Sequence, residues 1–208
     1  MQDHYHPTGL RIDIIHGEKA AVPLLLKIDK IIYNMKNLRD YKFILIDMDG
    51  TLVRTASGLT FPKTEHDWVP ILEMYDALKE NKPEYIHIVS NQGNMAKKNG
   101  VNEKAWCEKA DYICKCLQRY TGAKIVTFDY CTTTDKTDPK RKPNPGMFVS
   151  YIRHLKNNFI DVRLNECLMI GDASGKLGQF SDSDLMFAKN CGIDYIDATE
   201  YIRITLMK

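Results

Sequence analysis

Four short groups of residues carry the carboxylates, hydroxyl and ammonium group that phosphoryl transfer requires. They are Asp47-Met48-Asp49-Gly50-Thr51-Leu52, Ser90-Asn91-Gln92-Gly93, Arg141-Lys142-Pro143 and Gly171-Asp172-Ala173-Ser174-Gly175. Mg²⁺ prefers oxygen ligands and takes one or two carboxylates together with water and phosphate oxygens. Such a metal would offset the repulsion between an anionic nucleophile and an anionic substrate. The residue types therefore predict Mg²⁺-dependent transfer of a phosphoryl group through an aspartate.

The role expected of each residue follows from its side-chain chemistry. Asp47 would attack phosphorus and become an aspartyl-phosphate. Asp49 would protonate the leaving alkoxide and then take a proton from the attacking water. Ser90 would hold the phosphoryl oxygens and Lys142 would neutralise them. The predicted metal ligands are Asp47, Asp49 and Asp172, and the predicted phosphate-binding residues are Gly50, Thr51, Ser90, Asn91 and Lys142.

The hydrophobic pattern supplies the elements that would position these groups. It predicts strands at Phe43–Ile46, Tyr85–Val89, Lys124–Phe128, Cys167–Ile170 and Ile193–Ile196, and helices at Trp68–Asn81, Asn102–Thr121, Pro145–Asn158 and Asp184–Asn190. Strands that alternate with helices indicate an α/β fold with a central, mainly parallel sheet between helical layers. Ligands of such sheets bind at the carboxyl ends of the strands. Since each group follows a predicted strand, all four should meet at one edge of the sheet.

Length and composition limit the alternatives. A chain of 208 residues suits one globular domain, here 41–208, with 1–40 as an N-terminal extension packed on the core. A net charge of +2 excludes a strongly cationic nucleic-acid coat. No apolar run approaches the roughly 18 residues of a membrane span, and the start of the chain lacks a secretory signal. The six cysteines include no Cys-x-x-Cys pair, so we expect reduced thiols in a soluble, intracellular monomer.

The four groups resemble the motifs of the haloacid dehalogenase (HAD) superfamily of phosphatases. The resemblance covers roughly Lys42 to Glu200, and it implies a Rossmann-like HAD core. The short span from Leu52 to Trp68 leaves room only for a small loop or hairpin, so a large cap is not expected. Such an open site suits the end of a polymer.

One branch of that superfamily is more similar than the others. Ser57-Gly58-Leu59-Thr60-Phe61-Pro62, with Asp67-Trp68 after it, resembles the 3′-phosphatase domain of polynucleotide kinase/phosphatase. The stretch from Phe180 to Ile193 is similar to the same branch. This resemblance implies removal of a 3′-phosphate from nucleic-acid ends, usually DNA, as a repair step.

The departures from related families matter as well. The chain has no Gly-x-x-x-x-Gly-Lys-[Ser/Thr] loop, so 5′-kinase activity is not expected. The segment Cys131 to Arg141 has one Cys and no His, which removes the zinc loop of histidinol and heptose-bisphosphate phosphatases. The alternatives are a phosphatase of histidinol phosphate or a sugar phosphate, and a catalytically silent module that binds strand ends.

Several basic residues near the predicted site could contact DNA phosphates. They are Lys97, Lys98, Lys140, Arg141 and Lys176. They could form a local basic surface beside the scissile phosphate despite the near-neutral total charge. The role of Asp184 stays open between capping the following helix and standing near the metal, and we favour the cap. Trp68 could equally pack in the core or contact substrate.

Overall fold

A computed structural model describes residues 37–59, 62–64, 66–96, 102–179 and 181–207. The N-terminal extension therefore lies outside the described residues up to position 36. Lys97 and Lys98, two of the predicted DNA contacts, also lie outside them. Among the described residues, no helix has the length and apolar character needed to cross a membrane.

Within the described part of the chain, five strands form a parallel sheet in the order β5-β4-β1-β6-β7. Their bounds are Phe43–Ile46 (β1), Tyr85–Asn91 (β4), Ile125–Cys131 (β5), Cys167–Gly171 (β6) and Asp194–Asp197 (β7). β1 is central, with Ile46 beside Ile88 of β4 and Ile170 of β6. The predicted α/β class and parallel sheet are therefore confirmed.

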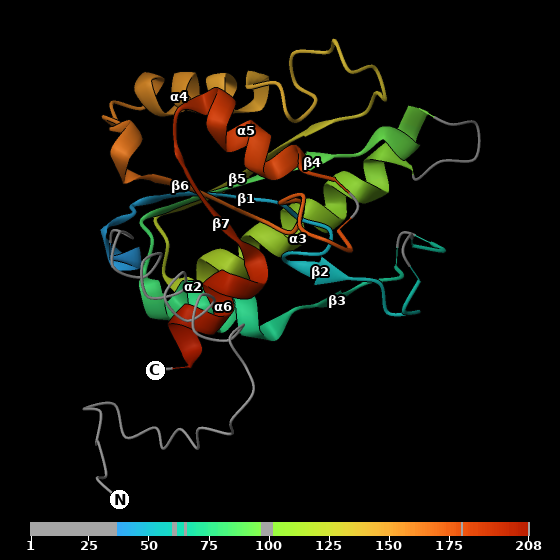
Figure 1. Cartoon of the computed structure of the whole chain (residues 1–208), viewed down its shortest axis with the longest axis horizontal. Coiled ribbons are helices and arrows are strands. Elements are labelled where there is room, and N and C mark those ends of the chain that lie inside the picture. The colour runs from blue at the N-terminus through green and yellow to red at the C-terminus, as the bar shows by residue number, and fades with distance from the viewer. Residues whose placement is uncertain (1–36, 60–61, 65, 97–101, 180, 208) are drawn as a thin grey trace, which may run out of the picture. The chain divides into compact units, whose positions relative to one another are not determined.

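Helices cover both faces of this sheet (Figure 1). The helices are α2 (Leu72–Asn81), α3 (Glu103–Thr121), α4 (Gly146–Asn157), α5 (Ser183–Cys191) and α6 (Ala198–Leu206), with short 3₁₀ turns at Leu38–Asp40 (η1), Gly93–Ala96 (η2) and Leu164–Glu166 (η3). Figure 1 shows α4 and α5 on one face and α2, α3 and α6 on the other. All four residues of β1 are buried, as expected for a strand covered on both faces.

Both ends of α3 are capped by residues suited to that role. The Asn102 side chain accepts a hydrogen bond from the Ala105 N–H and caps α3. Gly122 ends the same helix in the left-handed conformation, with φ of 77°.

The helix predicted from Trp68 begins later, at Leu72. Val69–Pro70 (β3) instead pairs with Val53–Arg54 (β2) in a small antiparallel hairpin. The sequence pattern missed this because two-residue strands leave almost no periodic signal. The hairpin agrees with the expected absence of a large cap.

α6 was not predicted from the sequence. The helix begins at a capping residue, because the Asp197 side chain accepts a hydrogen bond from the Thr199 N–H. An aspartate directly before a run with helical spacing is a typical helix start.

Candidate active site

Lys142 lies at the centre of the carboxyl edge of the sheet. Its Nζ is 2.5 Å from Asp47 Oδ1 and 2.7 Å from Asp184 Oδ1, and it donates to the Val89 carbonyl at 2.9 Å. Asp47 follows β1 and Asp184 lies in the first turn of α5, so the lysine joins elements far apart in the chain. All three side chains are buried. A buried ion pair of this kind is costly to break, because the remaining charge has no partner.

Three carboxylates share this edge. Oxygens of Asp47, Asp172 and Asp184 lie within 4.8 Å of one another. With all groups ionised, they face the single ammonium of Lys142 and leave an excess of negative charge. A divalent cation prefers such hard oxygen donors and would offset that excess. The donor set therefore fits Mg²⁺.

The titration behaviour reflects the same crowding. Burial raises the pKa of Asp47 well above its ordinary value, against the opposing charge of Lys142 and with the support of Asp184 and Asp172. Burial, then the charge of Asp184, raises the pKa of Asp172 to about 6. Burial disfavours the ammonium of Lys142, but Asp184 and Asp47 outweigh it and raise the pKa of Lys142. The lysine is therefore charged at neutral pH.

Gly50 brings the first motif into close contact with the fourth. It has φ of 89°, in the region that favours glycine. A Cβ at this position would stand 2.1 Å from Asp172 Oδ2. Its N–H donates to the Val53 carbonyl at 2.8 Å, which closes the turn after Asp49. Position 50 therefore needs glycine because its backbone lies so close to Asp172.

Asn91 fixes the backbone on which Lys142 stands. Its Nδ2 donates to the Lys142 carbonyl and its Oδ1 accepts from the Lys142 N–H, both at 2.9 Å. The Lys142-Pro143 peptide bond is cis. The Asn91 side chain is therefore engaged by the loop, and its predicted phosphate contact stays a prediction.

Ser90 and Thr51, two further predicted phosphate-binding residues, are both buried. Ser90 Oγ accepts from Gln92 Nε2 at 2.8 Å. Thr51 Oγ1 has no hydrogen-bond partner among the described residues. Their contacts with phosphate remain predictions.

Asp49 lies apart from the buried carboxylates and is exposed. Gln92 Nε2 donates to its Oδ2 at 2.6 Å, and Lys109 Nζ of α3 lies 3.4 Å from its Oδ1. The Lys109 side chain is only 10% exposed, and its Nζ lies 6.0 Å from the centre of the Trp68 ring. The Trp68 ring also contacts the Tyr112 ring edge to face. The sequence pattern did not identify Gln92 and Lys109 as site residues, although Gln92 lies in the Ser90-Asn91-Gln92-Gly93 motif.

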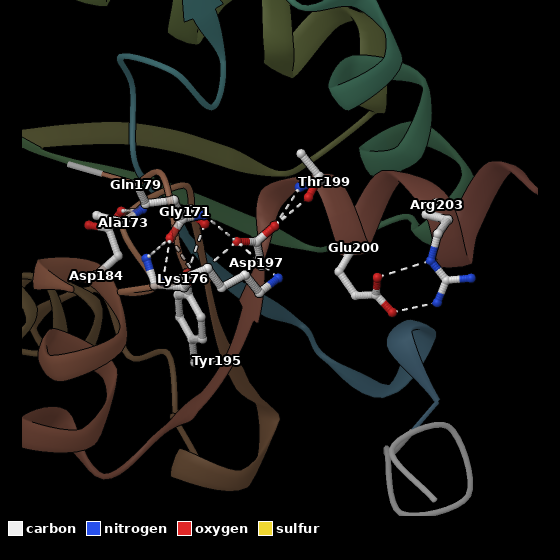
Figure 2. A network of polar contacts seen from close by, with 11 residues as sticks. Gly171, Ala173, Lys176, Gln179, Asp184, Tyr195, Asp197, Thr199, Glu200 and Arg203 are labelled. Carbon is white, nitrogen blue, oxygen red and sulfur yellow. Dashed lines mark hydrogen bonds and ion pairs between the residues drawn. The ribbon is translucent and has the colours of Figure 1, made fainter. Parts of the chain in front are cut away.

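The predicted helix cap at Asp184 is wrong. Asp182 occupies the cap position of α5, and the Asp184 Oδ2 instead accepts from the Ala173 N–H at 3.1 Å (Figure 2). A Cβ at Gly171 would stand 2.2 Å from that same oxygen. The cluster of carboxylates that could hold a metal thus includes Asp184, which the sequence did not predict, and the predicted metal contact of Asp49 stays a prediction. Spacing could not show this, because Asp184 lies one loop beyond the fourth motif.

The described candidates for DNA contact have partners within the chain. Lys140 Nζ lies 2.8 Å from Asp129, and Arg141 donates to the Thr133 carbonyl at 2.7 Å. Lys176 Nζ lies 3.3 Å from Asp197 and its side chain is 57% exposed. The predicted basic surface for DNA therefore stays a prediction.

The chain shares its fold with solved HAD-like phosphatases. The solved D,D-heptose 1,7-bisphosphate phosphatase from B. bronchiseptica, complexed with magnesium and phosphate, shares the fold with a TM-score of 0.56 and 20% identity. The likeness covers 74% of this chain and 78% of that one.

The sequence comparison narrows this class to a family. Residues 42–202 match the family described as polynucleotide kinase 3 phosphatase, and the chain belongs to it. It is 30% identical over 158 residues to the bifunctional polynucleotide phosphatase/kinase of Schizosaccharomyces pombe, covering 74% of this chain and 36% of that protein. It is 25% identical over 167 residues to the polynucleotide 3′-phosphatase ZDP of Arabidopsis thaliana, covering 77% of this chain and 24% of that protein. The match thus spans 36% and 24% of the lengths of these two relatives.

Proposed function

We propose that this protein is a Mg²⁺-dependent phosphatase that removes 3′-phosphate groups from DNA strand ends. The observation that carries the proposal is the contact of Lys142 with Asp47 and Asp184 beside Asp172, in a chain of the polynucleotide kinase 3 phosphatase family. The names of the two relatives, one of them a 3′-phosphatase, favour the end of a polynucleotide over a sugar phosphate.

In this proposal the chain's own residues carry the two steps. The free oxygen of Asp47 attacks phosphorus, while the proton of Asp49 passes to the oxygen of the breaking P–O bond. A water then attacks the aspartyl-phosphate and gives its proton to Asp49, which releases phosphate, restores the Asp47 carboxylate and returns Asp49 to its protonated form. Lys142 holds Asp47 in place through its other oxygen and neutralises the phosphoryl group. Mg²⁺, held by Asp47, Asp172 and Asp184, would supply positive charge against the substrate phosphate.

The proposed substrate side lies next to Asp49, since this residue protonates the leaving group. Lys109 lies beside Asp49 there and approaches the Trp68 ring. The described part of the segment between Leu52 and Trp68 forms a hairpin with β3 and no large cap. In the described part of that hairpin's loop, Asp67 accepts from the Ser57 N–H, the Ser57 hydroxyl and the Lys63 N–H. A site without a large cap suits a strand end better than a small molecule that must be enclosed.

Phosphate release from matched substrates tests the proposal. The panel is a 3′-phosphorylated DNA oligonucleotide, its 5′-phosphorylated counterpart, histidinol phosphate and a set of sugar phosphates, each with Mg²⁺ and with EDTA. We expect release from the 3′-phosphorylated strand only, and only with Mg²⁺, with Asp47→Asn as the blank. Release from histidinol phosphate or the sugar phosphates alone would contradict the substrate. No release from any of them would favour a module that binds strand ends.

A further inference from the structure

The loop between β6 and α5 carries Asp172 and has little regular structure of its own. It turns at Gly175 and Gly178, with φ of 74° and 89°. Its backbone bonds include Gly175 N–H to the Ser181 carbonyl and Gln179 N–H to the Lys176 carbonyl, both at 3.0 Å. Such a loop needs side-chain contacts to hold a metal ligand in one place.

Asp197, at the end of β7, gathers three side chains of this loop (Figure 2). Its Oδ2 accepts from Gln179 Nε2 at 2.8 Å and from Ser174 Oγ at 3.0 Å, and Lys176 Nζ lies 3.3 Å away. Gln179 extends the contact, because its Oε1 accepts from the Ser174 N–H at 2.7 Å. One carboxylate thus connects both turns of the loop.

The other oxygen of Asp197 is fixed by α6. Its Oδ1 accepts from the Thr199 N–H at 3.1 Å and from Thr199 Oγ1 at 2.5 Å. The side chain is buried, which would raise its pKa, but hydrogen bonds from Thr199, Gln179 and Ser174 prevail and lower the pKa of Asp197 to about 2. The Asp197 carboxylate is therefore ionised at neutral pH. It joins the loop to α6, which itself packs on α2 and β7.

A small shift of this loop would reach Asp172. The space beside its Oδ2 is so narrow that a Cβ at Gly50 would approach to 2.1 Å. On the other side of the loop start, Tyr195 of β7 donates to the Gly171 carbonyl at 2.9 Å. Groups that orient a metal ligand from behind commonly change metal affinity by roughly 10- to 100-fold when removed.

We propose that Asp197 is a positioning residue for the metal ligand Asp172, acting through Ser174, Gln179 and Lys176. It touches neither substrate nor metal. The proposal rests on the metal site of the proposed function, and not on the identity of the substrate. It also gives Lys176 a structural partner, while its predicted contact with a DNA phosphate stays a prediction.

Mg²⁺ binding to the metal-free full chain tests the proposal directly. We expect Asp197→Asn to raise the Mg²⁺ dissociation constant roughly tenfold in isothermal titration calorimetry. Excess Mg²⁺ should restore most of kcat, since Asp197 takes no part in the chemistry. A merely structural role would lower the melting temperature and leave the Mg²⁺ dissociation constant unchanged.

Glu200→Gln is the matched control. Glu200 lies three residues further along, on α6, and pairs with Arg203 away from the loop (Figure 2). It should bind Mg²⁺ like the wild type. If Asp197→Asn does not fold, Ser174→Ala removes one of the loop's three contacts with Asp197 and leaves the helix cap intact. This variant should also weaken Mg²⁺ binding. In the Asp197→Asn, Ser174→Ala double variant, the loss of Mg²⁺ binding free energy should be smaller than the sum of the two single losses, because both substitutions break the same contact.

The outcomes separate this proposal from the proposed function. If Asp197→Asn binds Mg²⁺ more weakly but the wild type turns over no oligonucleotide, the proposed DNA substrate is contradicted and the positioning role of Asp197 is supported. An unchanged dissociation constant in both Asp197→Asn and Ser174→Ala would overturn the positioning role. So would a wild type that binds no Mg²⁺.

Discussion

Asp47 and Asp49 stand two residues apart but occupy opposite environments. Asp47 is buried, contacts Lys142 and shares its surroundings with Asp172 and Asp184. Asp49 is exposed and contacts a neutral amide, Gln92, and a more distant cation, Lys109. We call Lys142 and the buried carboxylates the inner half of the site, and Asp49 with Gln92 and Lys109 the outer half. Excess negative charge dominates the inner half, whereas Asp49 in the outer half is open to solvent. Substitutions in the inner half should therefore cause large losses of activity or stability, and those in the outer half small losses.

The largest effect is expected for Asp47→Asn. The amide is a poor nucleophile, so kcat on the preferred substrate should fall by more than about a thousandfold. Phosphate release under single-turnover conditions measures it. Activity close to that of the wild type would remove Asp47 from the nucleophile's role.

Lys142→Met should cost stability as well as activity. It would leave buried carboxylates without their ammonium partner, which destabilises proteins by about 3–5 kcal/mol. The free energy of unfolding from urea titration in EDTA measures the loss. Lys140→Met is the control, since its pair with Asp129 is half-exposed and such pairs contribute about 0–1 kcal/mol. Equal losses in both variants would contradict the central role of Lys142.

Gly50→Ala and Gly58→Ala form a matched pair. Both residues have positive φ, 89° and 75°, so both variants pay the strain of a left-handed alanine. Only at Gly50 would the new Cβ meet Asp172; nothing lies within 4 Å at Gly58. We expect Gly50→Ala to weaken Mg²⁺ binding roughly tenfold, in line with a displaced ligand. Calorimetric titration should find Gly58→Ala unchanged.

The pH dependence of stability should show the crowding of the inner half. The folded-state pKa of Asp172, about 6, lies above the ordinary value of 3.8, so the folded protein binds more protons than the unfolded one between these values. Its contribution to stability is therefore present at low pH and is lost as pH rises through about 6. Relative to the wild type in EDTA, Asp172→Asn should gain on the order of 1 kcal/mol between pH 4 and pH 7. A flat difference would contradict the raised pKa.

The comparison with a variant is needed because another buried group acts in the opposite direction. Burial lowers the pKa of His87 from 6.5 to about 3, so its contribution is present above pH 6.5 and is lost as pH falls toward 3. His87 is common to both proteins and cancels in the difference. Adding Mg²⁺ should remove the penalty of ionised Asp172, because the metal binds the ionised form.

The smallest effect is expected in the outer half. Lys109→Met should lower kcat only severalfold, because Gln92 still holds Asp49. The loss should be greater for an alkyl phosphate than for p-nitrophenyl phosphate, whose leaving group needs little protonation. Lys104→Met is the control, since Lys104 is exposed and lies beside Glu108 on the same helix. Equal losses on both substrates would argue against a role in positioning Asp49.

The sequence was sufficient for the fold and for most of the residues at the sheet edge. Strand and helix periodicity placed β1, β4, β5 and β6, and a polar group follows each one, so their convergence could be predicted. It was not sufficient for groups that come from helices. Asp184 and Lys109 stand on α5 and α3, where a charged residue also has the ordinary role of a solvated side chain. Only packing shows that Asp184 turns inward to Lys142.

The order of the site residues along the chain determines when the site can form during synthesis. β1 precedes β4 and β6 in the chain yet lies between them. Asp47 therefore leaves the ribosome 95 residues before Lys142, and Asp172 and Asp184 follow later. A nascent chain that ends after α4 holds the nucleophile with its lysine but lacks two of the three carboxylates. The three carboxylates that could hold a metal therefore come together only late, when α5 emerges and docks against the strands already made.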